Sequence, residues 1–179
     1  MCQRNLQLAG CAVAVPVMQL LWLRLMGRSY FCPCGEVHLW QGRLDPAQNA
    51  QQFADWYSLL HVIFGMGLFV VLTRVRPGWP VRYRALMALL SSAIWEMVEN
   101  APWVIEAINR SAQAPHYAGD SILNSLADTL FAMLGFLLGW RLPGWSLLLL
   151  GAVLEISVSL AISDGLILGT LRLLGADVD

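Results

Sequence analysis

The chain has 179 residues, of which 58% are hydrophobic and 13% charged, and its mean hydropathy is +0.59. Soluble globular domains carry about 25% charged residues, so this composition excludes an ordinary soluble domain and indicates a membrane protein. The net charge of −1, with arginine but no lysine, also excludes the basic patch that nucleic-acid binding needs.

Five apolar runs predict five membrane-spanning helices. Each run is close to the ~20 residues that an α-helix needs to cross about 30 Å of hydrocarbon. The first continues to Met26 with no small-residue cleavage site after it, so we expect an uncleaved helix. The predicted fold class is an all-α, polytopic membrane helix bundle, with residues 1–179 as a single membrane domain. The predicted spans are 6–26, 53–73, 84–105, 119–140 and 145–168.

The connections between the runs indicate an orientation. The connection 74–84 is rich in arginine, so the positive-inside rule places it in the cytoplasm. The long outer loop 27–52 and the connection 106–117 then lie on the opposite side of the membrane.

A polar stripe opens the fourth run. Asp120, Asn124 and Asp128 follow the spacing i, i+4, i+8, so on a helix their side chains lie along one face. Ser121 and Ser125 lie at the edge of this face. The stripe therefore has to face something polar inside the membrane.

Other ionisable residues fall at matching depths. Near the centres of four different spans are His61, Glu96, Asp128 and Glu155. The next layer outward holds Glu99, Asn100 and Asn124, and the outer rim holds Asp55, Asp120 and Asp164.

Carboxylates at the bilayer centre cannot face lipid. Each costs about 2.5–3.5 kcal/mol there, so three of them would cost on the order of 8–10 kcal/mol, comparable with the stability of a whole domain. We therefore expect them to face inward as neutral acids, hydrogen-bonded pairs or metal ligands. The result would be a polar cleft descending from the outer rim to the midplane. The alternative, interhelical hydrogen bonding alone, requires fewer ionisable groups.

The candidate site residues follow from this layering. The predicted catalytic groups, as acid/base residues or metal ligands, are His61, Glu96, Glu99 and Asp128. The predicted binding residues are Asp55, Asn100, Asp120, Ser121, Asn124 and Glu155. The cofactor stays open, with a divalent metal as one option.

The outer loop carries a second, smaller pattern. Cys32, Cys34 and His38 are candidate zinc or copper ligands, although a fourth ligand is missing. A disulfide in an oxidising compartment, or a redox-sensitive turn that caps the cleft, explains the cysteines equally well.

Four motifs cover most of the chain. They are Cys-x-Cys-Gly at 32–35, Asp55-Trp56-Tyr57 with His61 and Gly65, Trp95-Glu96-x-x-Glu99-Asn100, and Tyr117-x-Gly119-Asp120-Ser121-x-x-Asn124-Ser125-x-x-Asp128. Together they resemble a family of small bacterial inner-membrane proteins of unknown function, and more loosely the VanZ-like membrane families. The family pattern has a second histidine where this chain has Phe64, and Arg-Asp-Asn where it has residues 163–165. The resemblance implies a multi-pass protein of the bacterial inner membrane and supplies no activity.

Three functions fit these residues. The first is an enzyme or binding protein whose cleft opens to the periplasmic side and takes a membrane lipid headgroup or an envelope precursor. The second is a proton- or cation-coupled transporter or relay, since acids embedded in a membrane often carry protons. The third is an accessory membrane subunit, whose acids are met by a membrane partner or a second copy of the chain.

Overall fold

The computed structural model describes residues 2–45, 47–111, 117–173 and 176. Within these ranges the chain is all-α and has seven helices, which confirms the predicted helical class. The helices are α1 (Cys2–Leu25), α2 (Trp56–Val75), α3 (Val81–Glu99), α4 (Pro102–Ser111), α5 (Ile122–Arg141), α6 (Gly144–Ile162) and α7 (Leu166–Leu173). Four of them, α1, α2, α5 and α6, are long and apolar enough to cross a membrane.

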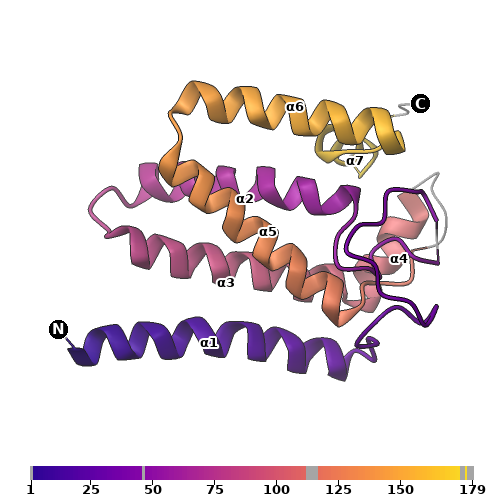
Figure 1. Cartoon of the computed structure of the whole chain (residues 1–179), viewed down its shortest axis with the longest axis horizontal. Coiled ribbons are helices and arrows are strands. Elements are labelled where there is room, and N and C mark those ends of the chain that lie inside the picture. Colours follow the sequence, from indigo (N-terminus) through magenta and orange to yellow (C-terminus); the bar gives the residue numbers. More distant parts are fainter. Residues whose placement is uncertain (1, 46, 112–116, 174–175, 177–179) are drawn as a thin grey trace.

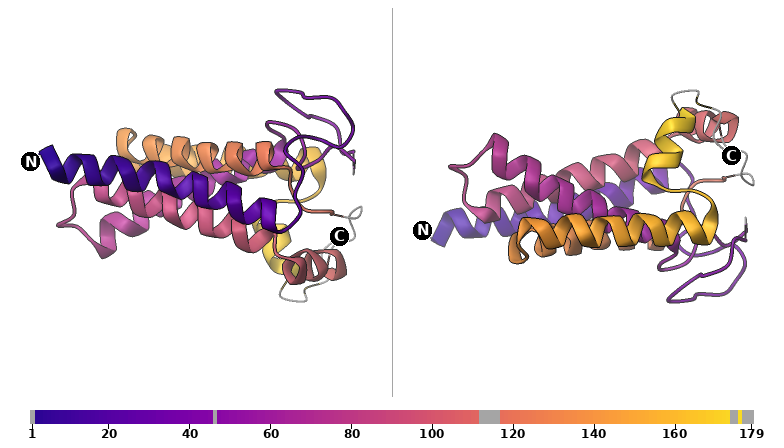
Figure 2. Two further views of the ribbon diagram at one scale, coloured as in Figure 1. Left: turned by 90° about the horizontal axis from the view of Figure 1, so that it is seen from below. Right: turned by 90° about the horizontal axis from the view of Figure 1, so that it is seen from above.

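The long helices lie side by side in a bundle (Figure 1). From top to bottom in Figure 1, α6, α2, α3 and α1 follow one another, and α5 crosses α2 and α3 obliquely. Helix α5 packs mainly on α2, while α1 lies along α3 and α6 lies along α2. The N-terminus and the α2–α3 and α5–α6 turns lie at one end, and the outer loop, α4 and α7 lie at the other, which we term the loop end (Figures 1 and 2).

Helix α5 forms the core of the bundle and makes its closest contact with α2. A Cβ atom on Gly65 would overlap the Ala132 carbonyl, and one on Gly135 would overlap the Val62 carbonyl. Small residues let helix backbones approach closely, which is how membrane helices gain packing energy. By contrast, α1 and α6 leave most of their apolar surface exposed, as helices that face lipid do.

The third predicted span is divided in two. Helix α3 ends at Glu99, and Pro102 begins the short helix α4. Proline has no N–H group to donate and suits the first position of a new helix. The prediction of one span to residue 105 was therefore wrong. Among the described helices, α3 also carries arginines and glutamates and is not one of the four apolar ones, so its place as a fifth span stays a prediction.

The last predicted span also ends early. Helix α6 stops at Ile162, Ser163 adopts the left-handed conformation with φ of 53°, and α7 begins at Leu166. The prediction of a single helix to residue 168 was wrong, because the polar residues 163–165 break it.

The fourth predicted span begins three residues too early. Ser121 is the N-cap of α5, and its hydroxyl accepts a hydrogen bond from the Asn124 N–H group. Asp120 therefore lies before the helix, so only Asn124 and Asp128 of the polar stripe share a helical face.

The outer loop completes the start of α5. The first N–H groups of a helix have no partner within it. Here the N–H groups of Ser121, Ile122 and Leu123 donate to the carbonyls of Ala50, Ser29 and Tyr30. The loop end of α5 is thereby tied to chain segments far away in the sequence.

Replacing Gly65 by alanine should weaken the α2–α5 contact. The new methyl group would meet the Ala132 backbone, which cannot move without moving the helix. Overpacking of this kind costs about 1–3 kcal/mol, so we expect a lower thermal unfolding midpoint for the purified protein in detergent. Gly67→Ala is the matched control, because nothing lies within 4 Å of its Cβ position. Equal midpoints for the two variants would contradict the close contact.

Candidate functional site

His61 stands at the centre of a buried polar cluster between α2, α3 and α5. Its Nδ1 lies 3.3 Å from Glu96 Oε1, and its Nε2 lies 3.8 Å from Asp128 Oδ2. Glu96 is fully buried, and the Asp128 and His61 side chains are nearly so. Three helices thus contribute one ionisable group each, and the imidazole stands between the two carboxyl groups.

Neutral polar side chains hold this cluster in place. The Ser125 hydroxyl donates to Glu96 Oε2 at 2.8 Å. Gln19 of α1 donates to both the hydroxyl and the carbonyl of Ser125 at 3.0 Å, and it accepts a hydrogen bond from the Thr129 hydroxyl at 3.1 Å. The Gln19 side chain is completely buried, so it fastens α1 to the core of the bundle.

Several buried atoms of the cluster have no hydrogen-bond partner among the described residues. They are His61 Nδ1, Glu96 Oε1, Asp128 Oδ1 and Asn124 Nδ2. His61 Nδ1 and Glu96 Oε1 are close, but their orientation does not form a hydrogen bond. An unpaired buried polar group costs about 1–3 kcal/mol, and native proteins keep few of them. Several in one place indicate bonding capacity that a ligand, an ion or a proton can use.

Glu99 extends the cluster toward the loop end. One donor atom from each of His61, Glu96 and Glu99 lies within 4.8 Å of the others. Imidazole and carboxylate groups are ligands for divalent metals. The arrangement can therefore perform acid–base chemistry or hold a metal ion.

Asp120 and Asn100 form the outer layer of the site. Asn100 Nδ2 donates to Asp120 Oδ2 at 2.5 Å, and the Asp120 N–H donates back to Asn100 Oδ1 at 2.8 Å. The Tyr117 hydroxyl donates to Asp120 Oδ1 at 2.6 Å. Burial raises the pKa of Asp120 to about 6, while the hydrogen bonds from Tyr117 and Asn100 act in the opposite direction.

The outer loop covers this layer. Gln51 Nε2 donates to the Gly119 carbonyl at 2.6 Å, and the Ser121 hydroxyl donates to the Gln51 carbonyl at 2.9 Å. Asp55, the N-cap of α2, accepts a hydrogen bond from the Ala50 N–H at 2.7 Å, and burial raises its pKa. The rim that the sequence predicted as an open mouth is therefore closed by the loop in this structure.

The position of the cluster along its helices also differs from the prediction. His61, Glu96 and Asp128 lie within two turns of the loop end of their helices, which is about 5–9 Å along the axis at about 1.5 Å per residue. A helix of 20 residues is about 30 Å long. The cluster therefore lies near the loop end of the helices and not midway along them, because α2 and α5 begin about three residues later than expected and α3 ends at Glu99. Its depth in a bilayer stays a prediction.

Glu155 and Asp164 lie outside the cluster. Glu155 accepts hydrogen bonds from the N–H groups of Leu166 and Ile167, at 3.2 and 2.8 Å, so it caps the start of α7. Asp164 accepts from the Tyr57 hydroxyl at 3.1 Å and pairs with Arg172 at 3.3 Å. The prediction that Glu155 faces the site was wrong, because the chain folds back at the end of α6 and places a helix N-terminus beside it.

The three candidate metal ligands of the outer loop do not form a metal site in the structure. Cys32 and Cys34 are joined by a disulfide, so neither offers a thiolate. His38 Nε2 lies 3.0 Å from Glu36 Oε2 instead. The disulfide alternative describes this turn, and the metal-ligand interpretation of it was wrong.

Sequence reasoning missed three polar residues that the site depends on. The sequence gives one indication that Gln19 has polar partners, since it is an amide within an apolar run. Ser58 completes the Asp55 capping box and lies beside Asp128, and the Asp-x-x-Ser spacing could have indicated it. Gln51 has no local signal, because its partners Gly119 and Ser121 are distant in the sequence.

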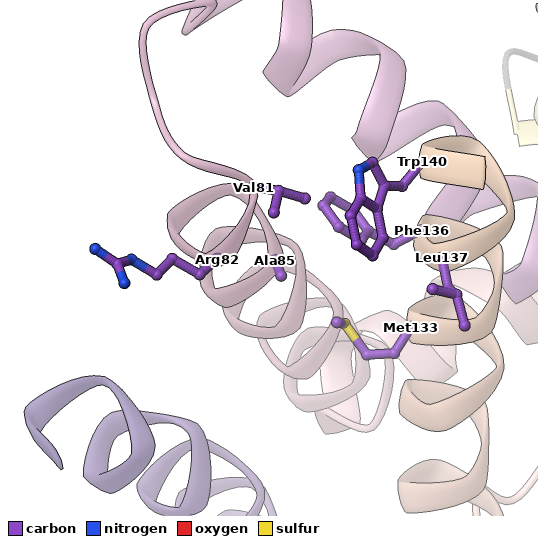
Figure 3. Close-up of a pocket in the computed structure, with 7 residues that line it drawn as sticks. All are labelled: Val81, Arg82, Ala85, Met133, Phe136, Leu137 and Trp140. Carbon is purple, nitrogen blue, oxygen red and sulfur yellow. The ribbon is translucent and has the colours of Figure 1, made fainter. Parts of the chain in front are cut away.

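A hollow near the opposite end of the bundle has a different character. It lies between α3 and α5 (Figure 3), and its walls are apolar except for Arg82, whose guanidinium points away from the other side chains. The lining residues are Val81, Arg82, Ala85, Met133, Phe136, Leu137 and Trp140. Nothing in this lining offers acid–base or ligand chemistry comparable with the His61 cluster.

Comparison with known proteins identifies the family. Residues 23–176 match the family described as "Protein of unknown function (DUF2585)". A UPF0314 protein of Paracoccus denitrificans is 39% identical over 160 residues, which cover 89% of this chain and 83% of that protein. One of Sphingopyxis alaskensis is 38% identical over 166 residues, covering 92% and 88%, and one of Sinorhizobium fredii is 40% identical over 164 residues, covering 90% and 82%. The chain belongs to the DUF2585 family.

Two further results concern solved structures and the VanZ-like families. No solved structure matches the chain. The looser likeness to VanZ-like families is not shown by these matches and stays a prediction.

Asp120 should make the stability of the protein depend on pH. A carboxyl group whose pKa is higher in the folded than in the unfolded protein binds its proton more tightly when folded. This group therefore favours the fold at and below about pH 4, and its contribution is lost as the pH rises through about 6. We expect the thermal midpoint of the wild type to fall across this window by more than that of Asp120→Asn.

The control for this measurement is Glu106→Gln, which removes an exposed acid on α4. Asp55 is present in all three proteins, and its charge acts on Asp120, so the difference between the profiles reports Asp120 together with that interaction. Parallel pH profiles for the wild type and Asp120→Asn would show that Asp120 does not titrate in this range.

Proposed function

We propose that this member of the DUF2585 family binds the polar headgroup of a membrane lipid, or of a lipid-linked envelope precursor, in the His61–Glu96–Asp128 cluster. The observation that carries the proposal is the set of buried donor and acceptor atoms without partners on three helices. A purely structural cluster would pair these atoms with one another, as the Gln19 and Ser125 pair does nearby.

The depth of the cluster favours a headgroup over a solute in transit. His61, Glu96 and Asp128 lie about 5–9 Å inside the loop end of their helices. This depth is close to the boundary between headgroups and acyl chains. A lipid could place its headgroup there while its chains remain in the bilayer.

The packing of α2 on α5 beneath the cluster favours a binding site over a conduit. Val62 and Gly65 of α2 meet Gly135 and Ala132 of α5 with their backbones in contact, on the side away from the loop end. No space for a water-filled path remains between the two helices at this contact. A site that is closed on the side away from the loop end suits binding and chemistry at one membrane surface.

The proposed entrance for a headgroup lies between α2 and α3. The Glu99 side chain is only partly buried, and the His61 side chain retains 12% exposure. The rings of Phe64 and Trp95 lie 6.3 Å apart below these residues and bridge the two helices. A headgroup could enter between α2 and α3 above this aromatic pair, with the outer loop as the cover of the site.

The distribution of charge supports a periplasmic position for the site. In the part of the chain that the structure describes, all Asp and Glu residues lie in the half of the bundle at the loop end. The opposite end bears Arg74, Arg76, Arg82, Arg84 and Arg141 without an acid. Arginine also lies at the loop end, at positions 24, 28, 43, 110 and 172, so the proposed orientation rests on the four arginines that flank the short α2–α3 turn. Under the positive-inside rule, that turn faces the cytoplasm and the loop end faces the periplasm of the bacterial inner membrane.

The chemistry available at the site is proton transfer. The imidazole of His61 has a carboxyl group facing each of its nitrogens. Such a group can take a proton from a bound hydroxyl or phosphate and pass it to a carboxylate. The same contacts favour a proton relay as the second candidate function, although the packed α2–α5 contact leaves that relay no continuation between these two helices.

The proposal is tested by the lipids that remain bound to the purified protein. The full chain is purified in mild detergent, and its retained lipids are identified and quantified by mass spectrometry. We expect one lipid class at a fixed ratio to the wild type. Loss of a hydrogen bond to a charged group costs about 1.5–3 kcal/mol, so Glu96→Gln and Asp128→Asn should weaken its retention about tenfold or more.

Glu155→Gln serves as the matched control, because Glu155 caps α7 outside the cluster. It should retain the lipid of the wild type. Equal lipid content in all four proteins would refute headgroup binding at the cluster. Unchanged lipids together with a proton flux into liposomes that Asp128→Asn abolishes would favour the relay.

A further inference from the structure

We infer that His61, Glu96 and Glu99 form a binding site for a divalent transition-metal ion, with Asp128 as a positioning residue for the imidazole. The inference deepens the proposed function, and its biological role rests on that function. The metal ion would be the group through which this acidic cluster holds the phosphate of a lipid headgroup.

The three donor atoms are already close together. One atom from each side chain lies within 4.8 Å of the others. Bonds of about 2.0–2.2 Å to one ion place its ligand atoms about 3–4 Å apart. Glu96 and Glu99 are at positions i and i+3 of α3, so they share a helix face, and small changes of side-chain torsion would bring all three donors onto one ion.

The unpartnered atoms are an independent sign of a ligand. Glu96 is completely buried, its Oε2 is occupied by the Ser125 hydroxyl, and its Oε1 has no hydrogen-bond partner. That oxygen lies 3.3 Å from His61 Nδ1, which is also without a hydrogen-bond partner. A metal ion between these two atoms would satisfy both.

Asp128 lies where the carboxylate that orients a metal-bound histidine would lie. A histidine that binds a metal usually donates its other ring N–H group to a carboxylate, which orients the ring. With Nδ1 toward Glu96, the Nε2 atom of His61 faces Asp128 Oδ2 at 3.8 Å. The same geometry assigns Nδ1 to the metal and Nε2 to Asp128.

The charge of the cluster calls for a cation. Glu96, Glu99 and Asp128 share a region of low dielectric, where like charges repel strongly. Arg28 stands at the outer rim, and its guanidinium is engaged with the carbonyls of Ala118 and Asn100. A divalent ion would neutralise two carboxylates within the cluster itself.

A metal ion would also decide which headgroups fit. Carboxylates alone repel a phosphate group, whereas a metal with three protein ligands keeps a coordination position open for a phosphate oxygen or a water molecule. One imidazole and two carboxylates suit Zn²⁺ or Mn²⁺, whereas Mg²⁺ and Ca²⁺ prefer oxygen ligands alone.

Metal binding is tested on the full chain in detergent after treatment with a chelator. Zn²⁺, Mn²⁺ and Mg²⁺ are titrated separately by calorimetry, and Co²⁺ is added to read the visible absorption of a bound ion. We expect one equivalent of Zn²⁺ or Mn²⁺ on the wild type, no binding of Mg²⁺, and a Co²⁺ spectrum. Glu99→Gln should lose the ion, and Asp128→Asn should weaken binding about 10–100-fold, as outer-shell changes do.

Two variants control for misfolding and for the loss of an acid elsewhere in the protein. Glu99 is only partly buried, so Glu99→Gln should fold even where Glu96→Gln fails to, and circular dichroism checks this. Glu155→Gln removes an acid outside the cluster and should bind the ion as the wild type does. Absence of Zn²⁺ and Mn²⁺ binding by the folded wild type would overturn the inference, and so would equal affinity in Glu99→Gln.

The outcomes for the metal and for the lipid are separable. Retained lipid without metal binding would refute the metal site and leave headgroup binding intact. Metal binding without a retained lipid would refute the proposed function and leave the metal site intact. Loss of phospholipid on chelation, with recovery after addition of Zn²⁺ or Mn²⁺, would support both together.

Discussion

The close approach of α2 and α5 is the contact on which the rest of the structure depends. Glycines at 65 and 135 allow the two backbones to touch, so the helices cross without intervening side chains. In a membrane, such contacts supply packing energy that lipid exposure cannot. Because His61 lies one turn from Gly65, and Asp128 lies one turn from Ala132, the contact sets the spacing between the imidazole and the carboxyl group.

Two sets of buried polar groups need partners at the loop end of the bundle, namely the first N–H groups of α5 and the carboxyl groups. A helix end exposes N–H groups that need acceptors, and α5 finds them in the loop carbonyls of Ser29, Tyr30 and Ala50. Buried acids need donors or cations, and Asp120 finds donors in Asn100 and Tyr117. The deeper acids lack a full set of donors, which distinguishes the His61 cluster from the well-paired layer above it.

Much of the fold could be predicted because the bilayer permits few solutions. Runs of about 20 apolar residues satisfy their backbone groups in lipid only as helices. The cost of a carboxylate in lipid also required Glu96 and Asp128 to face inward. Helix ends were less predictable, since the break after Glu99 and the start at Ile122 depend on capping partners rather than on hydropathy.

The sequence by itself determined the helical class, the four most apolar helices and the residues with chemical capacity. Only the tertiary structure decided which of those residues meet. Glu155 and Asp128 look alike in the sequence, since each is an acid within an apolar run. Asp128 faces His61 across the α2–α5 contact, whereas Glu155 caps α7 because the chain reverses at Ser163. The physical reason is that hydropathy is a property of each residue alone. The role of a buried polar group depends instead on the partners that folding brings from distant parts of the chain.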